Sequence, residues 1–526
     1  MTKRNFAIQN TFPCSLSTDG IVSYFSAEIN KKVPKWCEKI MADTLALAEI
    51  EHETLSFGRE LAGLLVASVL HTEEVVDEIS NESDRIRKES PQSLKNGYRS
   101  PRKITLLCGL VLIITSLYCV PRSLRKKKGK KRGVGQRGKE GAGLYPEWSA
   151  LGISEGASPA LREEVARTSV MLPSFELARQ ELARRDINID VKTTQRLTEE
   201  LGKQAISSRT DKLEKWHRGE IPAGNDFAGK TIAVSIDGGR ARTRENRKQG
   251  RKTKKGRNRY DTPWREPKLL SLYVVGPDGR IDKSSQQVID GTLQGPDHAM
   301  DLVAFHLHCL GAAKAKRIVF LGDGADWIWN RIPLVIERAG LKQRRCFTSL
   351  DPCHAMSHIA EALNTVKALD GTQVKKELTR LKGLLLEGKL DSVLSYLESL
   401  RGRRRKGKIV DALGYLRKRR KLMDYKRLKR LKLPIGSGSI ESAIRRVINL
   451  RLKNPGTFWN VENVERMLYL RAQILSNRWE EMIKEVKAHC RFTRNYQEEW
   501  TPTPYSIEDV DNSQVTVKPV LNKNCA

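Results

Sequence analysis

A chain of 526 residues is several times the usual size of one domain, so we expect about three folded units. Lys and Arg number 95 against 62 Asp and Glu, and the charge of +33 indicates nucleic acid as the partner rather than a small-molecule substrate, although a merely soluble basic protein has the same composition. The nine scattered cysteines lack paired CxxC spacing, which argues against a disulfide framework or a zinc ribbon and fits a reducing cytosol.

Residues 1–121 are expected to form a mainly helical N-terminal region. WCEKIMADTLALAEI and FGRELAGLLVASVLHTEEVVDEI repeat apolar residues every three or four positions, and the chain start has no apolar segment typical of a secretory signal. Residues 104–120 are almost wholly apolar and allow two interpretations, a membrane anchor at the short limit of a span or a buried β-hairpin turning near Gly109. We favour the hairpin, and hence a cytoplasmic, nucleoid-associated protein for which membrane contact is not expected.

A basic linker and a pair of helices are expected next. Residues 122–143 are rich in Lys, Arg and Gly, which is typical of a flexible linker that follows phosphates. Residues 144–228 predict a helix, a short break and a second helix starting near Val191, the order of a helix-turn-helix DNA-binding region. A helical hairpin without DNA contact would give the same pattern. The side chains expected to face a DNA groove are Lys192, Thr193 and Gln195.

From residue 229 the pattern indicates an α/β domain. The short β-rich runs TIAVSID, KLLSLYVVG, RIVFLGDG and CFTSLD alternate with amphipathic stretches as far as residue 354. Residues 355–433 predict helices alone, and residues 434–490 return to the core through one amphipathic helix, ESAIRRVINLRLK. We therefore expect an α/β core interrupted by an all-helical insertion and followed by a C-terminal tail at residues 491–526.

Three carboxylates lie at positions suited to metal-ion chemistry. Asp237 and Asp323 each end an apolar strand before glycine, where the backbone can pass close to a ligand, and Glu441 lies in the first turn of a helix after a Gly/Ser turn. Neighbouring acids repel each other, which favours a bound divalent cation. Three carboxylates suit two Mg²⁺ or Mn²⁺ ions acting on the attacking and leaving oxygens at phosphorus. Singly, each acid is equally explained as a turn former or a helix-dipole partner. The competing acids nearby are Asp297, Asp301, Asp326 and Asp424.

Several segments together carry a family resemblance. VSIDGGR, FLGDGADWIW, DPCH and LPIGSGSIESAIRRVINLRLKNPGTFW, with GLYPEWSALGISEGASPALREEVA upstream, resemble bacterial insertion-sequence transposases of the Kra type, whose core is similar to that of the Mutator-like DDE transposases. The likeness covers the chain from about residue 140 to about residue 480, and its most specific part is the Glu-bearing segment. It implies a ribonuclease-H-like core with Asp237, Asp323 and Glu441 as the catalytic, metal-holding triad. Asp351 and His354 match the family's (C/D)xxH motif, which implies that they position the cut strand or support the second acid.

Basic residues near these acids predict contacts with double-stranded DNA. Residues 241–259 contain ten basic residues and one acid and follow Asp237 closely, as expected of a loop that grips phosphates. Basic runs at 401–408 and 416–432 add charge to the helical insertion, and Trp459 could stack on a flipped base, although a core position explains it as well. The residues expected to contact DNA here are Arg242, Arg244, Arg247, Lys248, Arg251, Lys252, Arg445, Arg451, Lys453 and Trp459.

The functional hypothesis is a DNA transposase that cuts a phosphodiester at the ends of an insertion sequence and transfers the freed 3′-hydroxyl to target DNA. Because two ends must be handled together, the resemblance also implies a homo-oligomer. Two alternatives stay open. One is a ribonuclease-H-fold nuclease that only hydrolyses, and the other is a domesticated, inactive DNA-binding protein. Terminal inverted repeats beside the gene would favour the transposase.

Overall fold

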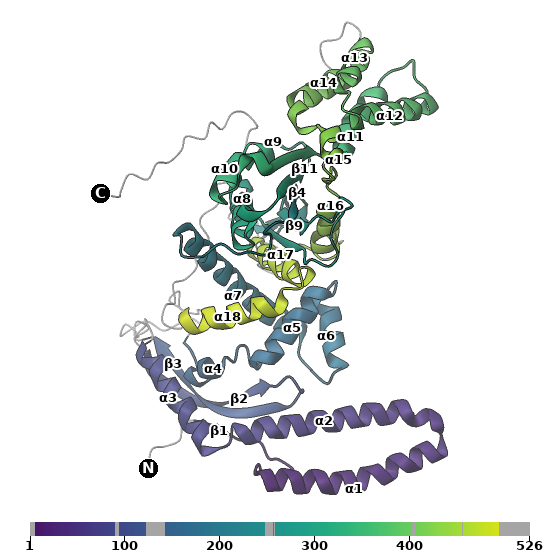
Figure 1. Ribbon diagram of the computed structural model, residues 1–526. Coiled ribbons are helices and arrows are strands. Elements are labelled where there is room, and N and C mark those ends of the chain that lie inside the picture. The colour runs from purple at the N-terminus through teal and green to yellow at the C-terminus, as the bar shows by residue number, and fades with distance from the viewer. Residues whose placement is uncertain are drawn as a thin grey trace, which may run out of the picture.

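The computed structural model describes residues 6–89, 94–121, 143–247, 256, 258–401, 407–454 and 456–493. The molecule is elongated, with a long helical hairpin at one end, a β-sheet near the middle and a group of helices projecting at the other end (Figure 1). The predicted linker and the predicted C-terminal tail lie almost wholly outside the described residues.

The N-terminal region is helical and ends in a β-hairpin, as predicted. Its elements are β1 (Ala7–Ile8), α1 (Thr18–Ala42), η1 (Thr44–Ala46), α2 (Leu47–Val69), α3 (Glu73–Glu89), β2 (Leu94–Thr105) and β3 (Val111–Pro121). Strands β2 and β3 pair antiparallel around a turn in which Gly109 has φ of 89°. Ile104, Leu112 and Ile114 are buried there against α2 and α3, which explains the apolar stretch. No helix in the described part of the chain is long and apolar enough to cross a membrane.

Four helices connect the hairpin to the sheet: α4 (Pro146–Leu151), α5 (Pro159–Met171), α6 (Phe175–Ala183) and α7 (Val191–His217). The predicted order of helix, break and helix is confirmed for α6 and α7. Asp190 is the N-cap of α7, because its side chain accepts a hydrogen bond of 2.9 Å from the backbone N–H of Thr193. Helix α7 is 27 residues long and packs against the C-terminal helices α17 and α18, so it also belongs to the core.

The central sheet has five strands in the order β10-β9-β4-β11-β12. They are β4 (Thr231–Gly238), β9 (Lys268–Val274), β10 (Val288–Thr292), β11 (Arg317–Gly322) and β12 (Cys346–Leu350). Strands β4, β11 and β12 are parallel to one another, whereas β9 runs antiparallel to both of its neighbours, β4 and β10. The chain is therefore mixed α/β, as predicted, and all four predicted strands are present. Strand β10 was not predicted.

Residues of β4 alternate between two layers of the core. Ile232, Val234 and Ile236 face a cluster with α8 and α10, whereas Ala233 faces the opposite layer, near α15. The remaining core elements are η3 (Ala312–Lys314), α8 (Pro296–Cys309), α9 (Asp326–Trp329), α10 (Ile332–Arg338) and η4 (Gln343–Arg345), with the short strands β5 (Ala241–Arg242), β6 (Glu245–Asn246), β7 (Tyr260–Asp261) and β8 (Trp264–Arg265).

Helices fill the predicted insertion. They are α11 (Pro352–Leu363), α12 (Gly371–Leu386), α13 (Leu390–Ser399), α14 (Lys408–Lys418), η5 (Arg420–Leu422) and α15 (Tyr425–Arg430). The chain then returns to the sheet through α16 (Gly438–Ile444), the π-helical turn η6 (Arg445–Asn449), α17 (Val461–Leu475) and α18 (Trp479–Thr493). The single helix predicted from Glu441 onward is thus shorter than expected, because it passes into the π-turn and ends near Leu450.

Candidate active site

Two of the predicted acids lie together at the carboxyl edge of the sheet. Strands β4 and β11 are parallel neighbours with Ile236 opposite Gly322, so Asp237 and Asp323 leave the sheet side by side. Burial raises the pKa of Asp237 to about 6, and the negative charge of Asp323 adds to this rise, whereas the charge of His354 opposes it. The predicted pairing of these two carboxylates is therefore present in the structure.

The glycines after Asp237 leave room for protein atoms. A Cβ atom on Gly239 would lie 2.2 Å from Cδ1 of Ile448, and one on Gly238 would lie 2.1 Å from Oε1 of Glu266. The sequence pattern predicts that these glycines give a ligand access to the backbone. The structure instead uses them to let the Glu-bearing segment and the chain before β9 approach the end of β4.

Asp351 connects the end of β12 to the segment that precedes Glu441. Its Oδ2 accepts hydrogen bonds from the backbone N–H and the hydroxyl of Ser437, at 2.5 and 2.6 Å, and its Oδ1 accepts one of 2.6 Å from the N–H of Cys353. Burial by itself would raise the pKa of Asp351, but these hydrogen bonds outweigh burial and hold the pKa below its usual value. Asp351 thus holds the entry to the helix of Glu441, and its own N–H donates to the carbonyl of Gly322, next to Asp323, at 2.9 Å. Its role in positioning the cut strand or supporting the second acid stays a prediction.

Helix α16 lies on strands β4 and β9 and carries Glu441 in its first turn, as predicted. A small polar cluster fixes it there: the hydroxyls of Ser271 and Ser439 are 2.9 Å apart, and the amide of Gln287 donates to both. The side chain of Glu441 is exposed. The carboxylate is therefore accessible from solvent, and its charge acts on Cys353, which follows the end of β12.

The π-turn after α16 leaves carbonyl groups that need donors. Buried Arg471 supplies them, since its guanidinium donates to the carbonyls of Arg446, Val447 and Val170, with a length of 2.9 Å to Val447. π-turns inside helices recur at functional sites, and this one follows the Glu441 helix directly. The helix is thus held at both ends, by Asp351 before it and by Arg471 after it.

The helical insertion packs on the loop that carries Asp323. Arg419 donates a hydrogen bond of 2.7 Å from Nε to the carbonyl of Gly324, and it lies 3.0 Å from Asp326. A Cβ atom on Gly324 would lie 2.1 Å from the hydroxyl of Tyr415. This docking places the insertion close to the second acid.

Glu266 and Lys268 also border the acid pair, and sequence reasoning missed both. Glu266 lies over Gly238, and its charge contributes to the raised pKa of Asp237. Lys268 is buried, 2.6 Å from Glu266 and 4.6 Å from the ring of Trp327. The motif EPK before a strand gave no indication of this role. Glu266 is therefore an alternative to Glu441 as the third carboxylate.

The acids that compete with the triad have other partners. Asp297 pairs with Arg331 at 2.6 Å and Asp301 pairs with Arg338. Asp326 pairs with the insertion, and Asp424 caps α15 by accepting from the N–H of Arg427. Each of these four acids is explained by its ion pair or its helix cap. Asp237 and Asp323 are therefore the better candidates for catalytic acids.

The fit to a divalent cation is partial. Asp237 and Asp323 offer hard oxygen donors and repel each other, which a cation would relieve. Within the described residues, however, no group of three or more His, Cys, Asp or Glu side chains is arranged to hold a metal ion. Asp237 and Asp323 thus form a pair, and among the described residues neither Glu441 nor Glu266 completes a set of three.

The residues predicted to contact DNA differ in how exposed their side chains are. Arg242, Arg244, Arg247, Arg445, Lys453 and Lys192 are exposed. Thr193 is bound to Asp190 through its hydroxyl at 2.7 Å, and the amide of Gln195 donates to Glu199 at 2.6 Å, so neither side chain is free of partners. Lys248, Arg251 and Lys252 lie outside the described residues.

Arg451 and Trp459 are buried, so the predicted DNA contacts of both are wrong for this structure, and the core position left open for Trp459 is the one observed. They are 3% and 7% exposed, and the guanidinium of Arg451 lies 4.7 Å from the ring centre of Phe175 and 4.9 Å from that of Trp459. An arginine beside two aromatic rings is stabilised by cation–π attraction in the core. Both residues therefore connect α6 to the segment after α16 and present nothing to DNA here.

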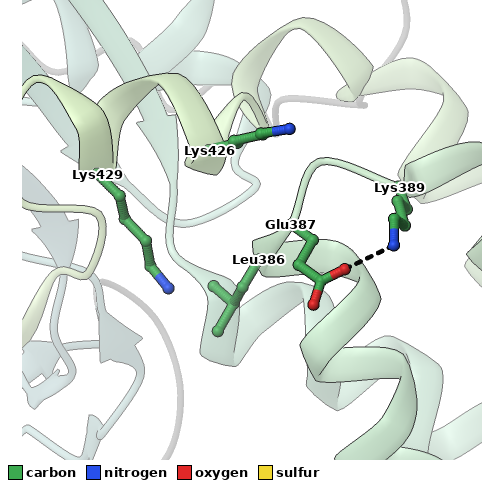
Figure 2. A pocket seen from close by; sticks show the side chains of 5 residues that line it. All are labelled: Leu386, Glu387, Lys389, Lys426 and Lys429. Carbon is green, nitrogen blue, oxygen red and sulfur yellow. Dashed lines mark ion pairs between the residues drawn. The ribbon is translucent and has the colours of Figure 1, made fainter.

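A pocket of about 410 Å³ opens in the helical insertion. Figure 2 shows Lys426 and Lys429 on one helix facing Leu386 and Glu387, while Lys389 forms an ion pair of 2.8 Å with Glu387. Its lining is cationic and includes none of the predicted catalytic residues. It adds to the positive surface of the insertion.

No protein-family model matches this chain, and no curated protein matches it either.

Proposed function

We propose that the chain is a DNA transposase that cuts phosphodiesters at the ends of an insertion sequence and transfers the 3′ end, with a ribonuclease-H-like core. The observation that carries this proposal is the juxtaposition of Asp237 and Asp323 at the ends of adjacent parallel strands. The mixed five-stranded sheet, with a group of helices between its last strand β12 and the helix of Glu441, is compatible with that core. The charge of +33 supports DNA as the substrate.

In the proposed reaction, Asp237 and Asp323 would hold Mg²⁺ or Mn²⁺, with Glu441 as the third carboxylate. The bound ions would supply activation of the attacking oxygen and stabilisation of the leaving oxygen. Asp351 and Arg471 keep the Glu441 helix against the sheet. Exposed arginines near the acids would position the DNA through its phosphates, independently of base sequence.

The test is incubation of the purified protein with Mg²⁺ and a labelled duplex carrying the ends of its own element. Cleavage and strand joining are expected, and Asp237→Ala, Asp323→Ala and Glu441→Ala should each abolish both while DNA binding persists. Cleavage without joining would favour a hydrolytic nuclease. Binding without cleavage by the wild type would favour an inactive DNA-binding protein.

A further inference from the structure

A small β-arm begins immediately after the first acid. Strand β5 pairs with β8, and β6 pairs with β7, so residues on both sides of the predicted basic loop lie together. The segment after the Glu441 helix joins this arm, because the N–H of Arg244 donates to the carbonyl of Trp459 at 2.7 Å and the N–H of Trp459 donates to the carbonyl of Arg242 at 3.2 Å. Three distant parts of the sequence thus form one surface.

Side chains alternate across this arm. Ala241, Thr243 and Trp459 are buried below it. On the other side three aromatic rings are exposed, Trp264 at 49%, Tyr260 at 43% and Phe458 at 37%. Large exposed rings gathered on one face of a protein mark a binding surface more often than chance exposure.

Arginines lie over these rings. The guanidinium of Arg242 is 5.3 Å from the ring centre of Trp264 and 5.4 Å from that of Phe458. The guanidinium of Arg244 is 4.1 Å from the ring centre of Tyr260. Rings offer flat faces for bases and guanidinium groups offer contacts for phosphates, a combination typical of proteins that bind unpaired nucleotides.

The position of this surface indicates which nucleotides it would bind. Arg242 follows Asp237 by a few residues, and Glu266, two residues after Trp264, reaches back over Gly238. The arm therefore begins within a few residues of Asp237 along both chain segments, so a strand bound at the acid pair would have the rings nearby. An apolar protein partner fits less well, because the rings are interleaved with positive charge and the whole chain carries +33.

We propose that Trp264, Tyr260 and Phe458, with Arg242 and Arg244, form a stacking surface for unpaired DNA bases beside the phosphodiester that is cut. This inference rests on the proposed function, since it places the surface next to the cutting site. The sequence suggested Trp459 as the stacking residue, whereas this proposal assigns base stacking to the exposed rings of the arm.

The test measures binding by the full-length chain with Asp237→Asn, which prevents cleavage. Affinity is compared between a blunt duplex and the same duplex with a short unpaired thymidine tail. A third, tailed probe contains a fluorescent adenine analogue and reports base stacking. Tighter binding of the tailed duplex and quenching of the analogue are expected. Trp264→Ala should weaken tailed binding roughly ten-fold, whereas Trp264→Phe should retain most of it. Binding of the blunt duplex should change little.

Tyr98→Ala is the matched control, since Tyr98 is an exposed ring at 53% on the N-terminal hairpin, and it should change neither affinity. Equal affinity for the two duplexes, or equal loss of both in Trp264→Ala, would overturn the proposal. So would a change in oligomeric state of DNA-free Trp264→Ala, which would assign the rings to an interface between copies. If the wild type cleaves DNA but binds tailed and blunt duplexes equally, the stacking surface is rejected and the transposase proposal stands. If the protein prefers tailed duplexes but the wild type does not cleave, the transposase proposal is rejected and the stacking surface stands.

Discussion

Ser437 donates two hydrogen bonds to one carboxylate oxygen of Asp351, from its N–H at 2.5 Å and from its hydroxyl at 2.6 Å. The two residues are 86 positions apart, and the whole helical insertion lies between them. This contact closes the insertion onto the sheet and sets where the helix of Glu441 begins.

Asp351→Asn should therefore weaken both stability and cleavage. Hydrogen bonds to a charged group contribute about 1.5–3 kcal/mol, and Ser437→Ala, which removes only the hydroxyl, should cost about 1 kcal/mol. Urea unfolding measures the stability, and end cleavage at saturating DNA measures the activity. Ser357→Ala is the control, because the exposed hydroxyl of Ser357 donates to the carbonyl of Cys353 and not to Asp351. Full cleavage by Asp351→Asn would contradict a role in holding the Glu441 helix.

Neutralising one acid of the pair should remove cleavage and yet stabilise the metal-free protein. The pKa of Asp237 is raised to about 6, above its ordinary 3.8, so charging it costs folding free energy as pH rises through this interval. In urea unfolding, Asp237→Asn should raise the free energy of unfolding by up to about 3 kcal/mol above about pH 6, with the gain gone below about pH 4. Asp326→Asn should do the opposite, because Asp326 pairs with Arg419 and Lys418. A urea midpoint of Asp237→Asn below that of the wild type at pH 8 would contradict repulsion between Asp237 and Asp323.

Glu441 and Glu266 can be distinguished as the third carboxylate. Glu441→Gln should abolish end cleavage, since the proposed set of three includes it. Glu266→Gln should keep cleavage within several-fold, because Glu266 is already paired with Lys268 at 2.6 Å. Both variants are compared at equal DNA occupancy over a range of Mn²⁺ concentrations. The reverse result, loss in Glu266→Gln and activity in Glu441→Gln, would transfer the role to Glu266.

Gly324→Ala should disturb the docking of the insertion onto the Asp323 loop. The new Cβ would lie 2.1 Å from the hydroxyl and 2.5 Å from ring carbons of Tyr415, which is too close for either group to remain in place. We expect loss of cleavage and a destabilisation of about 1–3 kcal/mol. Tyr415→Ala should restore part of both in the double variant, measured as a double-mutant cycle. Gly414→Ala, with nothing within 4 Å of its Cβ, is the control and should be neutral or slightly stabilising. Additive effects in the cycle would argue against the contact.

Much of the core followed from local sequence. Apolar runs ending in Asp predicted β4 and β11, because buried parallel strands need continuous hydrophobic residues. Strand β10 was missed because its Asp290 and Gly291 are typical of a turn. Buried Arg209 and His306, each 2.9 Å from Asp290, make that carboxylate stable in a strand. The burial of Arg451 and Trp459 was missed for a similar reason. A basic residue near an aromatic one predicts a surface, and only the packing of α6 encloses them.

The same buried network predicts sensitivity to acid. His306 lies 2.9 Å from Asp290, and Arg209 and Arg478 also act on it. Burial lowers the pKa of His306 below its ordinary 6.5 in spite of the hydrogen bond to Asp290. For Asp290, burial opposes ionisation, but Arg209 and His306 outweigh it and lower the pKa to about 2. The folded state therefore binds fewer protons than the unfolded state at both residues, so stability falls as pH decreases.

The decrease should come in two intervals. The contribution of His306 is complete above the unfolded pKa of 6.5 and is lost as pH falls below it, whereas that of Asp290 is lost only between about 3.8 and about 2. The difference in urea midpoint between wild type and His306→Gln isolates this contribution, because Asp237 acts in the opposite direction in both proteins. This difference should be constant above about pH 7 and should shrink between about pH 6.5 and pH 5, whereas wild type and His52→Gln, changed at an exposed position, should show no such pH-dependent difference. An identical pH profile for wild type and His306→Gln would mean that His306 is protonated to the same extent in the folded and unfolded states.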